Sequence, residues 1–337
     1  MRLQALLSNG RLAHGWLLTG KSGIGKLEFA LHLTRYLLCR QKDQHGPCGG
    51  CQECHLFAAG THPDVKLLQP SSYEPVWPNE EIDKKEAKSR QVKIEQVREA
   101  IEFAQGTAQR GGAKIILLRP AEAMNNNTAN ALLKILEEPP ALTYLFLISE
   151  QPSLLLPTLR SRSQLLEFRS PPQSDALAWL HKQSPGAEND LYLQLAQGAP
   201  LHALRLMKDQ AVIGFSQLLQ ALESLLQNDL TPVQAARKCD DLGMLRTIDY
   251  QLLAIGKMLP ALQSGETVGL AQLKALCDLC LGLPRTLMLR RLHGYHATLI
   301  KARRIALASN NANPQLVLES LFAEWAQLLQ QRNARSA

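Results

Sequence analysis

The stretch LLTGKSGIGKLEFALHLTRYLLCR, residues 17–40, decides the fold. An apolar run is followed by Gly20, Gly25 and Lys26 at the spacing G-x-x-x-x-G-K, and a helical pattern comes next. This order is typical of a phosphate-binding loop, whose backbone N–H groups surround phosphates at the start of a helix. The position after the lysine normally carries Ser or Thr, whose hydroxyl binds Mg²⁺, but here it is Leu27. The sequence therefore predicts a degenerate Walker A loop.

Around this stretch, the first 170 residues alternate short apolar strands with helical patterns. The predicted strands are 16–19, 64–68, 114–118, 144–148 and 164–168. The predicted helices are 26–39, 93–105 and 128–138. Apolar strands separated by helices indicate a parallel sheet that is covered on both faces. We therefore expect an α/β fold, interrupted at 69–92 by a charged, proline-containing loop of low order.

The rest of the chain has helical patterns. The segment RSPPQSD, residues 169–175, separates it from the sheet domain. Residues 171–208 predict a small helical domain. From 209 to 337 the long runs are amphipathic and end in a polar tail, which predicts a second all-helical domain. A chain of 337 residues is long enough for two or three domains.

Composition excludes some classes of protein and leaves others open. No apolar window approaches the roughly 18 residues of a membrane span, and the N-terminal residues lack the pattern of a secretion signal. We therefore expect a cytoplasmic protein. The net charge of +7 permits a polyanionic partner, but the basic residues are scattered, so a solvated surface explains the charge equally well. Seven cysteines without a secretion signal argue against a disulfide framework.

Four of the seven cysteines lie close together in the sequence and predict a metal site. They are Cys39, Cys48, Cys51 and Cys54. Spacings of two residues let thiolates converge on Zn²⁺, and four thiolates leave no open position, which favours a structural site. His45 and His55 are alternative ligands for one position, and buried free thiols are the alternative to a metal site. Cys277 and Cys280 share the spacing, but they continue a helical apolar pattern that predicts core packing.

The metal-binding carboxylate of an ATPase is expected just after a buried strand. The sequence AKIILLRPAEAM offers the strand but places Arg119 and Pro120 at the two positions that follow it. A cation there would repel Mg²⁺, and Glu122 lies two residues further on. With the hydroxyl of the loop also missing, we expect neither ATP hydrolysis nor productive ATP binding. Lys26 could still hold an anion at the helix N-terminus.

The segment LLPTLRSRS, residues 155–163, places an arginine between two small residues at a strand boundary. Arg162, flanked by Ser161 and Ser163, is a candidate for a trans-acting arginine finger. Such a residue stabilises the charge that develops on the phosphate of a neighbouring subunit. The alternative is an ordinary surface cation.

The ordered motifs GKSGIGK, CGGCQEC, THPD, ALLKILEEPP and LLPTLRSRS resemble the clamp-loader branch of the AAA+ family. The cysteine module narrows the resemblance to the clamp loader of bacterial DNA polymerase III. Further matches are QGAPLHALRL and, near the end, NPQLVLESLFAEW. Hydrolysing subunits of that complex would carry a hydroxyl at Leu27, a carboxylate pair at Arg119-Pro120 and a sensing arginine at Leu201. This chain therefore resembles the non-hydrolysing subunit.

The resemblance implies three domains. Residues 1–170 form an AAA+ P-loop-like domain with the zinc module at 39–54, residues 171–208 form a lid, and residues 209–337 form a helical collar. The family's serine-arginine-cysteine motif reads here Ser161-Arg162-Ser163, so one letter departs from the pattern. The loop at 69–92 is a second departure.

The resemblance also implies partners and a role. The subunit would help to load the sliding clamp on primed DNA, within the DNA-directed DNA polymerase holoenzyme, and would present Arg162 to the ATP of a neighbouring gamma/tau subunit. Delta would lie on its other side, and no membrane is involved. Two rival interpretations stay open: an active AAA+ ATPase with compensating residues, and a stand-alone zinc-containing nucleic-acid-binding protein.

Overall fold

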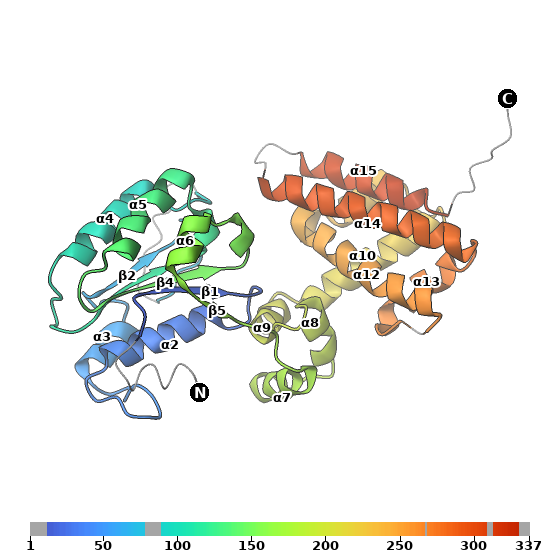
Figure 1. The fold of residues 1–337 in the computed structure, drawn as a ribbon. Coiled ribbons are helices and arrows are strands. Elements are labelled where there is room, and N and C mark those ends of the chain that lie inside the picture. Colours follow the sequence, from blue (N-terminus) through green and yellow to red (C-terminus); the bar gives the residue numbers. More distant parts are fainter. Residues whose placement is uncertain (1–11, 78–88, 267, 309–312, 330–337) are drawn as a thin grey trace. The chain divides into compact units, whose positions relative to one another are not determined.

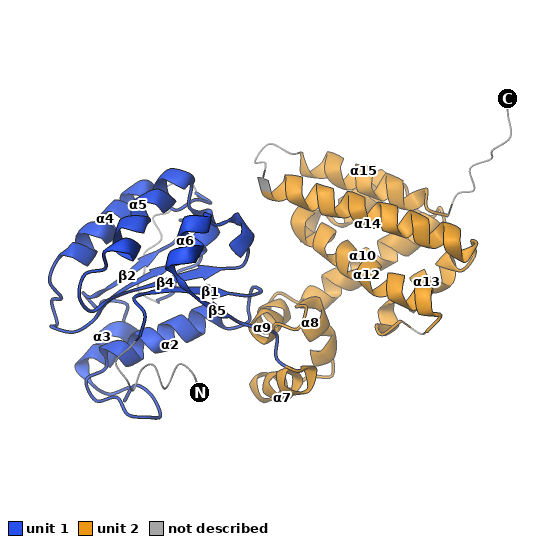
Figure 2. Cartoon of the chain, viewed as in Figure 1, with its two compact units in different colours: residues 1–171 blue, residues 172–337 orange. Residues whose placement is uncertain are grey.

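The computed structural model describes residues 12–77, 89–266, 268–308 and 313–329. The chain forms two compact units, Met1–Pro171 and Pro172–Ala337 (Figure 2). The division of the second unit into lid and collar at residue 208 stays a prediction. Three parts of the chain that carry sequence-based predictions lie outside the described residues. They are the N-terminal residues 1–11, residues 78–88 of the predicted 69–92 loop, and the polar tail from residue 330.

The first unit is built on one sheet of parallel strands in the order β2-β3-β4-β1-β5 (Figure 1). The strands are β1 Gly15–Thr19, β2 Val65–Leu68, β3 Lys114–Leu118, β4 Thr143–Ser149 and β5 Gln164–Glu167. The three central strands are almost wholly buried, as their continuous apolar sequences require. The predicted parallel α/β sheet is confirmed, and each strand ends within one residue of its predicted bounds.

Helices cover both faces of this sheet (Figure 1). One face packs against α4 Ile94–Gln105, α5 Asn126–Glu137 and α6 Pro157–Arg162. The other packs against α2 Lys26–Leu38 and α3 Gln52–Ala58. The three predicted helices are confirmed as α2, α4 and α5, whereas the short helices α3 and α6 were not predicted. Their six or seven residues carry too little periodicity to be recognised in a sequence.

The sheet is less well covered at β5. Leu165 of β5 is 62% exposed, although its neighbour in the register, Leu17 of β1, is only 2% exposed. A hollow of about 670 Å³ lies beside them, and Pro157 and Arg160 of α6 form part of its wall. Within the described residues, no strand pairs with the outer edge of β5.

A buried lysine fixes the end of α4 to the sheet. Lys114, the first residue of β3, is 4% exposed, and burial lowers its pKa. Its ammonium group donates hydrogen bonds to the carbonyl oxygens of Phe103, Ala104 and Gly106 at the C-terminal end of the helix. These carbonyls have no partner within the helix, so the lysine acts as a cap supplied by a neighbouring strand.

Replacing Lys114 with methionine is expected to destabilise the protein by about 1–3 kcal/mol, because Met keeps the volume but leaves the buried carbonyls without a donor. Urea unfolding of the full chain measures this difference. Lys66→Met is the matched control, since Lys66 pairs with Glu99 at the surface and such a pair is worth about 0–1 kcal/mol. Equal midpoints for the two variants would contradict the capping role.

The second unit consists of helices in its described residues (Figure 2). They are α7 Gln173–Gln183, α8 Asn189–Leu195, α9 Pro200–Lys208, α10 Ala211–Leu226, α11 Pro232–Lys238, α12 Met244–Ser264, α13 Lys274–Cys280, α14 Arg285–Ala308 and α15 Pro314–Ala326. One apolar core runs through them, and α12 packs along α14. Cys277 and Cys280 belong to this core, and burial raises their pKa values to about 11 and about 12, as expected for packed thiols.

Among the described residues, no helix combines the length and the apolar character that a bilayer span needs.

Candidate metal centre and degenerate nucleotide site

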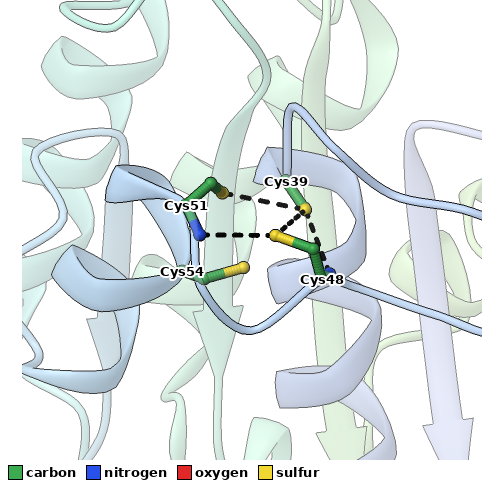
Figure 3. Close-up of side chains that lie close together, drawn as sticks. All are labelled: Cys39, Cys48, Cys51 and Cys54. Atoms are coloured by element: carbon green, nitrogen blue, oxygen red, sulfur yellow. Dashed lines mark hydrogen bonds between the residues drawn. The ribbon is translucent and has the colours of Figure 1, made fainter.

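The four clustered cysteines meet at one place on the first unit (Figure 3). Cys39 is the C-cap residue directly after α2, and Cys48 comes from the loop that follows. Cys51 precedes α3, and Cys54 lies in the first turn of that helix. Their sulfur atoms all lie within 4.8 Å of one another. Gly49, with φ of 78°, supplies the left-handed backbone that the turn between Cys48 and Cys51 needs.

The distances between sulfur atoms suit a tetrahedral metal site. The Sγ atom of Cys39 lies 3.5 Å from that of Cys48 and 3.8 Å from that of Cys51. A zinc ion with bonds of about 2.3 Å to each sulfur sets sulfur atoms about 3.8 Å apart. All four cysteines are free thiols. The donor set therefore fits a closed Cys₄ metal site.

The surroundings shift the pKa values of two thiols of the cluster in opposite directions. The backbone N–H of Cys54 is the main cause that lowers the pKa of Cys51 to about 6, so this sulfur is ready to act as a thiolate. Burial raises the pKa of Cys39 to about 11. Backbone N–H groups also donate to sulfur at two other places, from Cys48 to Cys39 and from Cys51 to Cys48, both at 3.3 Å. Such bonds stabilise coordinated thiolates.

The two histidines near the cluster do not belong to it. The group of side chains that could hold a metal contains the four cysteines alone, among the residues the structure describes. His45 is exposed and its Nε2 lies 3.4 Å from the side-chain amide of Gln44, and His55 is exposed on α3. The sequence left these histidines open as alternative ligands, and the geometry favours the four cysteines.

In the phosphate-type loop, the side chain of the lysine binds carbonyl oxygens of the loop itself. Lys26, the first residue of α2, is 4% exposed, and its Nζ donates to the carbonyl oxygens of Gly20 at 2.7 Å and Lys21 at 2.6 Å. The carboxylate of Glu150 lies 4.0 Å away. Gly20 has φ of 147°, and a Cβ there would come 2.5 Å from the carbonyl oxygen of Phe168, so only glycine fits.

The end of β3, where a metal-binding carboxylate is expected, carries a tethered cation. Arg119 donates from Nε to Gln69 at 2.7 Å and from its terminal nitrogen to the Glu74 carbonyl at 2.7 Å, and it lies over the ring of Tyr73. Part of the predicted 69–92 loop is thus ordered against this arginine. Glu122 accepts hydrogen bonds from the backbone N–H groups of residues 150 and 151 after β4, at 2.9 and 3.1 Å.

The predicted finger residue has a local partner that the sequence did not reveal. Arg162 ends α6 with its side chain 40% exposed, and its Nε lies 2.8 Å from Oε1 of Glu137 at the end of α5. Ser161 is exposed and donates to the Thr158 carbonyl at 3.0 Å. Ser163 is buried, and its hydroxyl has no hydrogen-bond partner among the described residues. Arg162 is thus paired with Glu137 at the surface, and its role as an arginine finger stays a prediction.

The position where a hydrolysing subunit would carry a sensing arginine is occupied here by an apolar residue. Leu201 is the second residue of α9 and is half-buried in the second unit. Leu27, the second residue of α2, is half-buried against the core of the first unit. Neither leucine offers a polar side-chain atom to a nucleotide.

Comparison with known proteins shows which family the chain is similar to. Residues 1–172 match the family model described as DNA polymerase III, delta subunit. The DNA polymerase III subunit delta' of Pseudomonas aeruginosa is 36% identical, covering 94% of this chain and 92% of that protein. The Escherichia coli subunit delta' is 36% identical over 66% of this chain and 62% of that protein. A solved gamma subunit-related protein from Thermotoga maritima covers 97% of this chain and 98% of its own at 19% identity and a TM-score of 0.43, too distant to carry an argument.

The parallel sheet, the phosphate-type loop and the inserted cysteine cluster define an α/β protein with a P-loop-like site. The family model covers more than half of the chain, and the Pseudomonas relative matches it almost from end to end. The chain belongs to the family of DNA polymerase III delta-prime subunits.

Proposed function

We propose that this protein is the non-hydrolysing subunit of a DNA polymerase III clamp loader, which helps to place the sliding clamp on primed DNA. Family membership supports the role in the polymerase. The observation that carries the non-hydrolysing part is the phosphate-type loop, in which Lys26 is bound to the loop's own carbonyls. A P-loop lysine in a working site instead neutralises the charge of the β- and γ-phosphates.

The surroundings of the loop support the same proposal. A nucleotide-bound Mg²⁺ needs a hydroxyl at Leu27 and a carboxylate at the end of β3. Leu27 is half-buried against the core, and Arg119 is held at the strand end by Gln69 and by the carbonyl of Glu74. A fixed positive charge at that position opposes a divalent cation. These contacts favour a retained fold without catalysis over the rival interpretation of an active ATPase.

Arg162 is the residue we propose to act in catalysis, at the ATP of a neighbouring gamma/tau subunit. Its guanidinium is partly exposed at the end of a short helix, between Ser161 and Ser163. Arg160 and Ser161 on the same helix border the hollow beside β5, so the surface around the arginine is uneven and partly apolar. Such a surface suits contact with another protein.

We further propose that the four cysteines hold a structural Zn²⁺. A closed set of four thiolates without an open position suits a structural rather than a catalytic metal. The cluster lies within the α/β unit, between α2 and α3. This position argues against the rival of a stand-alone zinc-dependent nucleic-acid binder, because the cysteines join two helices of the sheet domain instead of building a separate module.

The partners follow from this role. We propose that the gamma/tau and delta subunits flank this protein, that residues 209–337 serve as the collar and residues 171–208 as the lid, and that the sliding clamp and DNA are met through the assembly. The expected location is the cytoplasm. Specific co-purification with gamma/tau and delta is the direct test of the assembly.

The purified chain alone is expected to hydrolyse no ATP above background, because neither the metal ligands nor the lysine is available. The same sample should show no rise in melting temperature with Mg·ATP, whereas a ligand at 100 times its Kd would add about 2.7 kcal/mol of stability. Turnover that survives further purification would revive the active-ATPase interpretation. Salt-sensitive DNA binding without partners would instead favour the nucleic-acid binder.

A further inference from the structure

A buried glutamate lies inside the cysteine cluster's own helix. Glu53 is the second residue of α3, directly before Cys54, and it is 3% exposed. A buried carboxylate is costly unless charged and hydrogen-bonding partners surround it. Nothing in the local sequence around Glu53 distinguishes it from a surface glutamate.

Three side chains from three separate segments converge on this carboxylate. Arg110 donates from Nε to Oε2 at 3.1 Å and from its terminal nitrogen to Oε1 at 2.9 Å. Arg40 approaches Oε1 with its Nε at 3.2 Å. His62 lies with Nε2 at 3.1 Å from Oε2. Both oxygens are therefore occupied, and the Arg110 contact has the two-point geometry that fixes orientation as well as distance.

The motif THPD explains how this network reaches the sheet. The backbone N–H of Asp64 donates to Nδ1 of His62 at 3.1 Å, so the other ring nitrogen carries the proton that faces Glu53. The Asp64 carboxylate in turn accepts the backbone N–H groups of Gln109 and Arg110, at 2.7 and 2.8 Å. The motif thus ties the start of β2 to the loop that carries Arg110.

The network also joins the two halves of the cysteine cluster. Arg40 directly follows Cys39 at the end of α2, and Glu53 directly precedes Cys54 at the start of α3. The contact between Arg40 and Glu53 therefore holds the two segments together beside the sulfur atoms. Arg110 and His62 then anchor this pair to the sheet, so a shift of α3 would break contacts on both sides.

We propose that Glu53 is the positioning residue of the cysteine cluster: it sets α3 so that the four sulfurs converge, and it couples metal binding to the stability of the sheet domain. The inference rests on the proposed metal site. Residues behind the ligands that fix their orientation typically change metal affinity by about 10- to 100-fold when they are replaced. Glu53 acts through the backbone of α3 and through Arg40, without touching the metal.

The test uses the full-length protein, with Zn²⁺ and with Co²⁺ as a spectroscopic probe. Glu53→Gln keeps the size of the side chain but removes its charge. We expect this variant to bind Zn²⁺ about 10- to 100-fold more weakly in competition with a chelator. We also expect its Co²⁺ spectrum to lose the intensity of a regular tetrahedral site, and Zn²⁺ to raise its melting temperature less than that of the parent.

Two further variants make the result specific. Glu99→Gln is the matched control, because Glu99 pairs with Lys66 at 2.7 Å on the exposed surface of the same unit, and it should behave as the parent protein. Arg110→Lys keeps the positive charge but removes the two-point contact. It should weaken Zn²⁺ binding in the same direction, and it tests the proposal if Glu53→Gln fails to fold.

The outcomes separate this inference from the function on which it rests. A parent protein that binds neither Zn²⁺ nor Co²⁺ would overturn the metal site itself. A parent that binds both, with Glu53→Gln and Arg110→Lys equal to it in affinity and spectrum, would overturn the positioning role alone. Equal loss of stability with and without metal would show a structural contact that is independent of the cluster, and would also overturn the coupling.

Discussion

An Arg162→Ala variant is expected to slow ATP hydrolysis at the adjoining gamma/tau site by about 10³-fold or more, which is the range that arginine fingers contribute. The guanidinium would lie against the γ-phosphate as charge develops there, and alanine leaves that charge unbalanced. The measurement is DNA- and clamp-stimulated hydrolysis by a reconstituted gamma/tau–delta–delta-prime complex. Its steady-state rate should fall by at least the share of the adjoining site.

The ion pair of Arg162 with Glu137 does not prevent this role. The two atoms lie 2.8 Å apart, but the side chains are 40% and 47% exposed. Exposed pairs of this kind are worth about 0–1 kcal/mol, so releasing the arginine toward a phosphate costs little. The glutamate therefore holds the arginine in an ordered position from which it can still move.

Arg169→Ala is the control for this experiment. Arg169 lies outside the motif, its side chain is 84% exposed, and its partner among the described residues is Glu167. Both variants have to assemble as well as the parent protein in size-exclusion chromatography. If Arg162→Ala hydrolyses ATP at the same rate as Arg169→Ala, the arginine is a surface cation and the finger proposal fails.

Removing one ligand from the cysteine cluster is expected to have the largest effect on stability. Cys54→Ser should abolish stoichiometric zinc, because Cys54 is buried and serine is a poor zinc ligand. Loss of a structural metal belongs to the few single changes that cost more than about 4 kcal/mol. At about 2–4 °C per kcal/mol, the melting temperature of the sheet domain should fall by about 8–16 °C.

Elemental analysis and thermal unfolding check this prediction together. The parent protein should contain one zinc ion per chain, and a strong chelator should lower its melting temperature toward that of Cys54→Ser. Cys280→Ser is the control, since Cys280 is buried in the helical unit and lies outside the cluster. A parent without zinc, or a Cys54→Ser variant as stable as Cys280→Ser, would contradict the metal site.

The sequence predicted those parts of the fold that depend on neighbouring residues. Continuous apolar runs identified the strands, because a strand buried on both faces has no polar side to mislead the pattern. The four cysteines could be recognised as a group because all of them lie within sixteen residues of the chain. The degenerate loop was recognisable because Leu27 and Arg119 occupy positions that a motif defines.

Contacts between distant segments could not be predicted in this way. Lys114 caps a helix that ends nine residues earlier, Arg162 pairs with Glu137, and Glu53 meets Arg110 across 57 positions of the sequence. Each of these residues carries a charge, and from sequence alone a charge is assumed to be solvated. Only the packing of α3, α4 and α6 on the sheet brings them to their partners.

The exposed edge strand β5 affects how this protein is expected to behave during recombinant expression. Leu165 of this strand is 62% exposed, and within the described residues the outer edge of β5 pairs with no further strand. Such an edge invites other chains to add to it, with the leucine as the first contact. When the chain is overexpressed without its partner subunits, we therefore expect it to aggregate. Producing the subunits together should raise the yield of clear, monodisperse material.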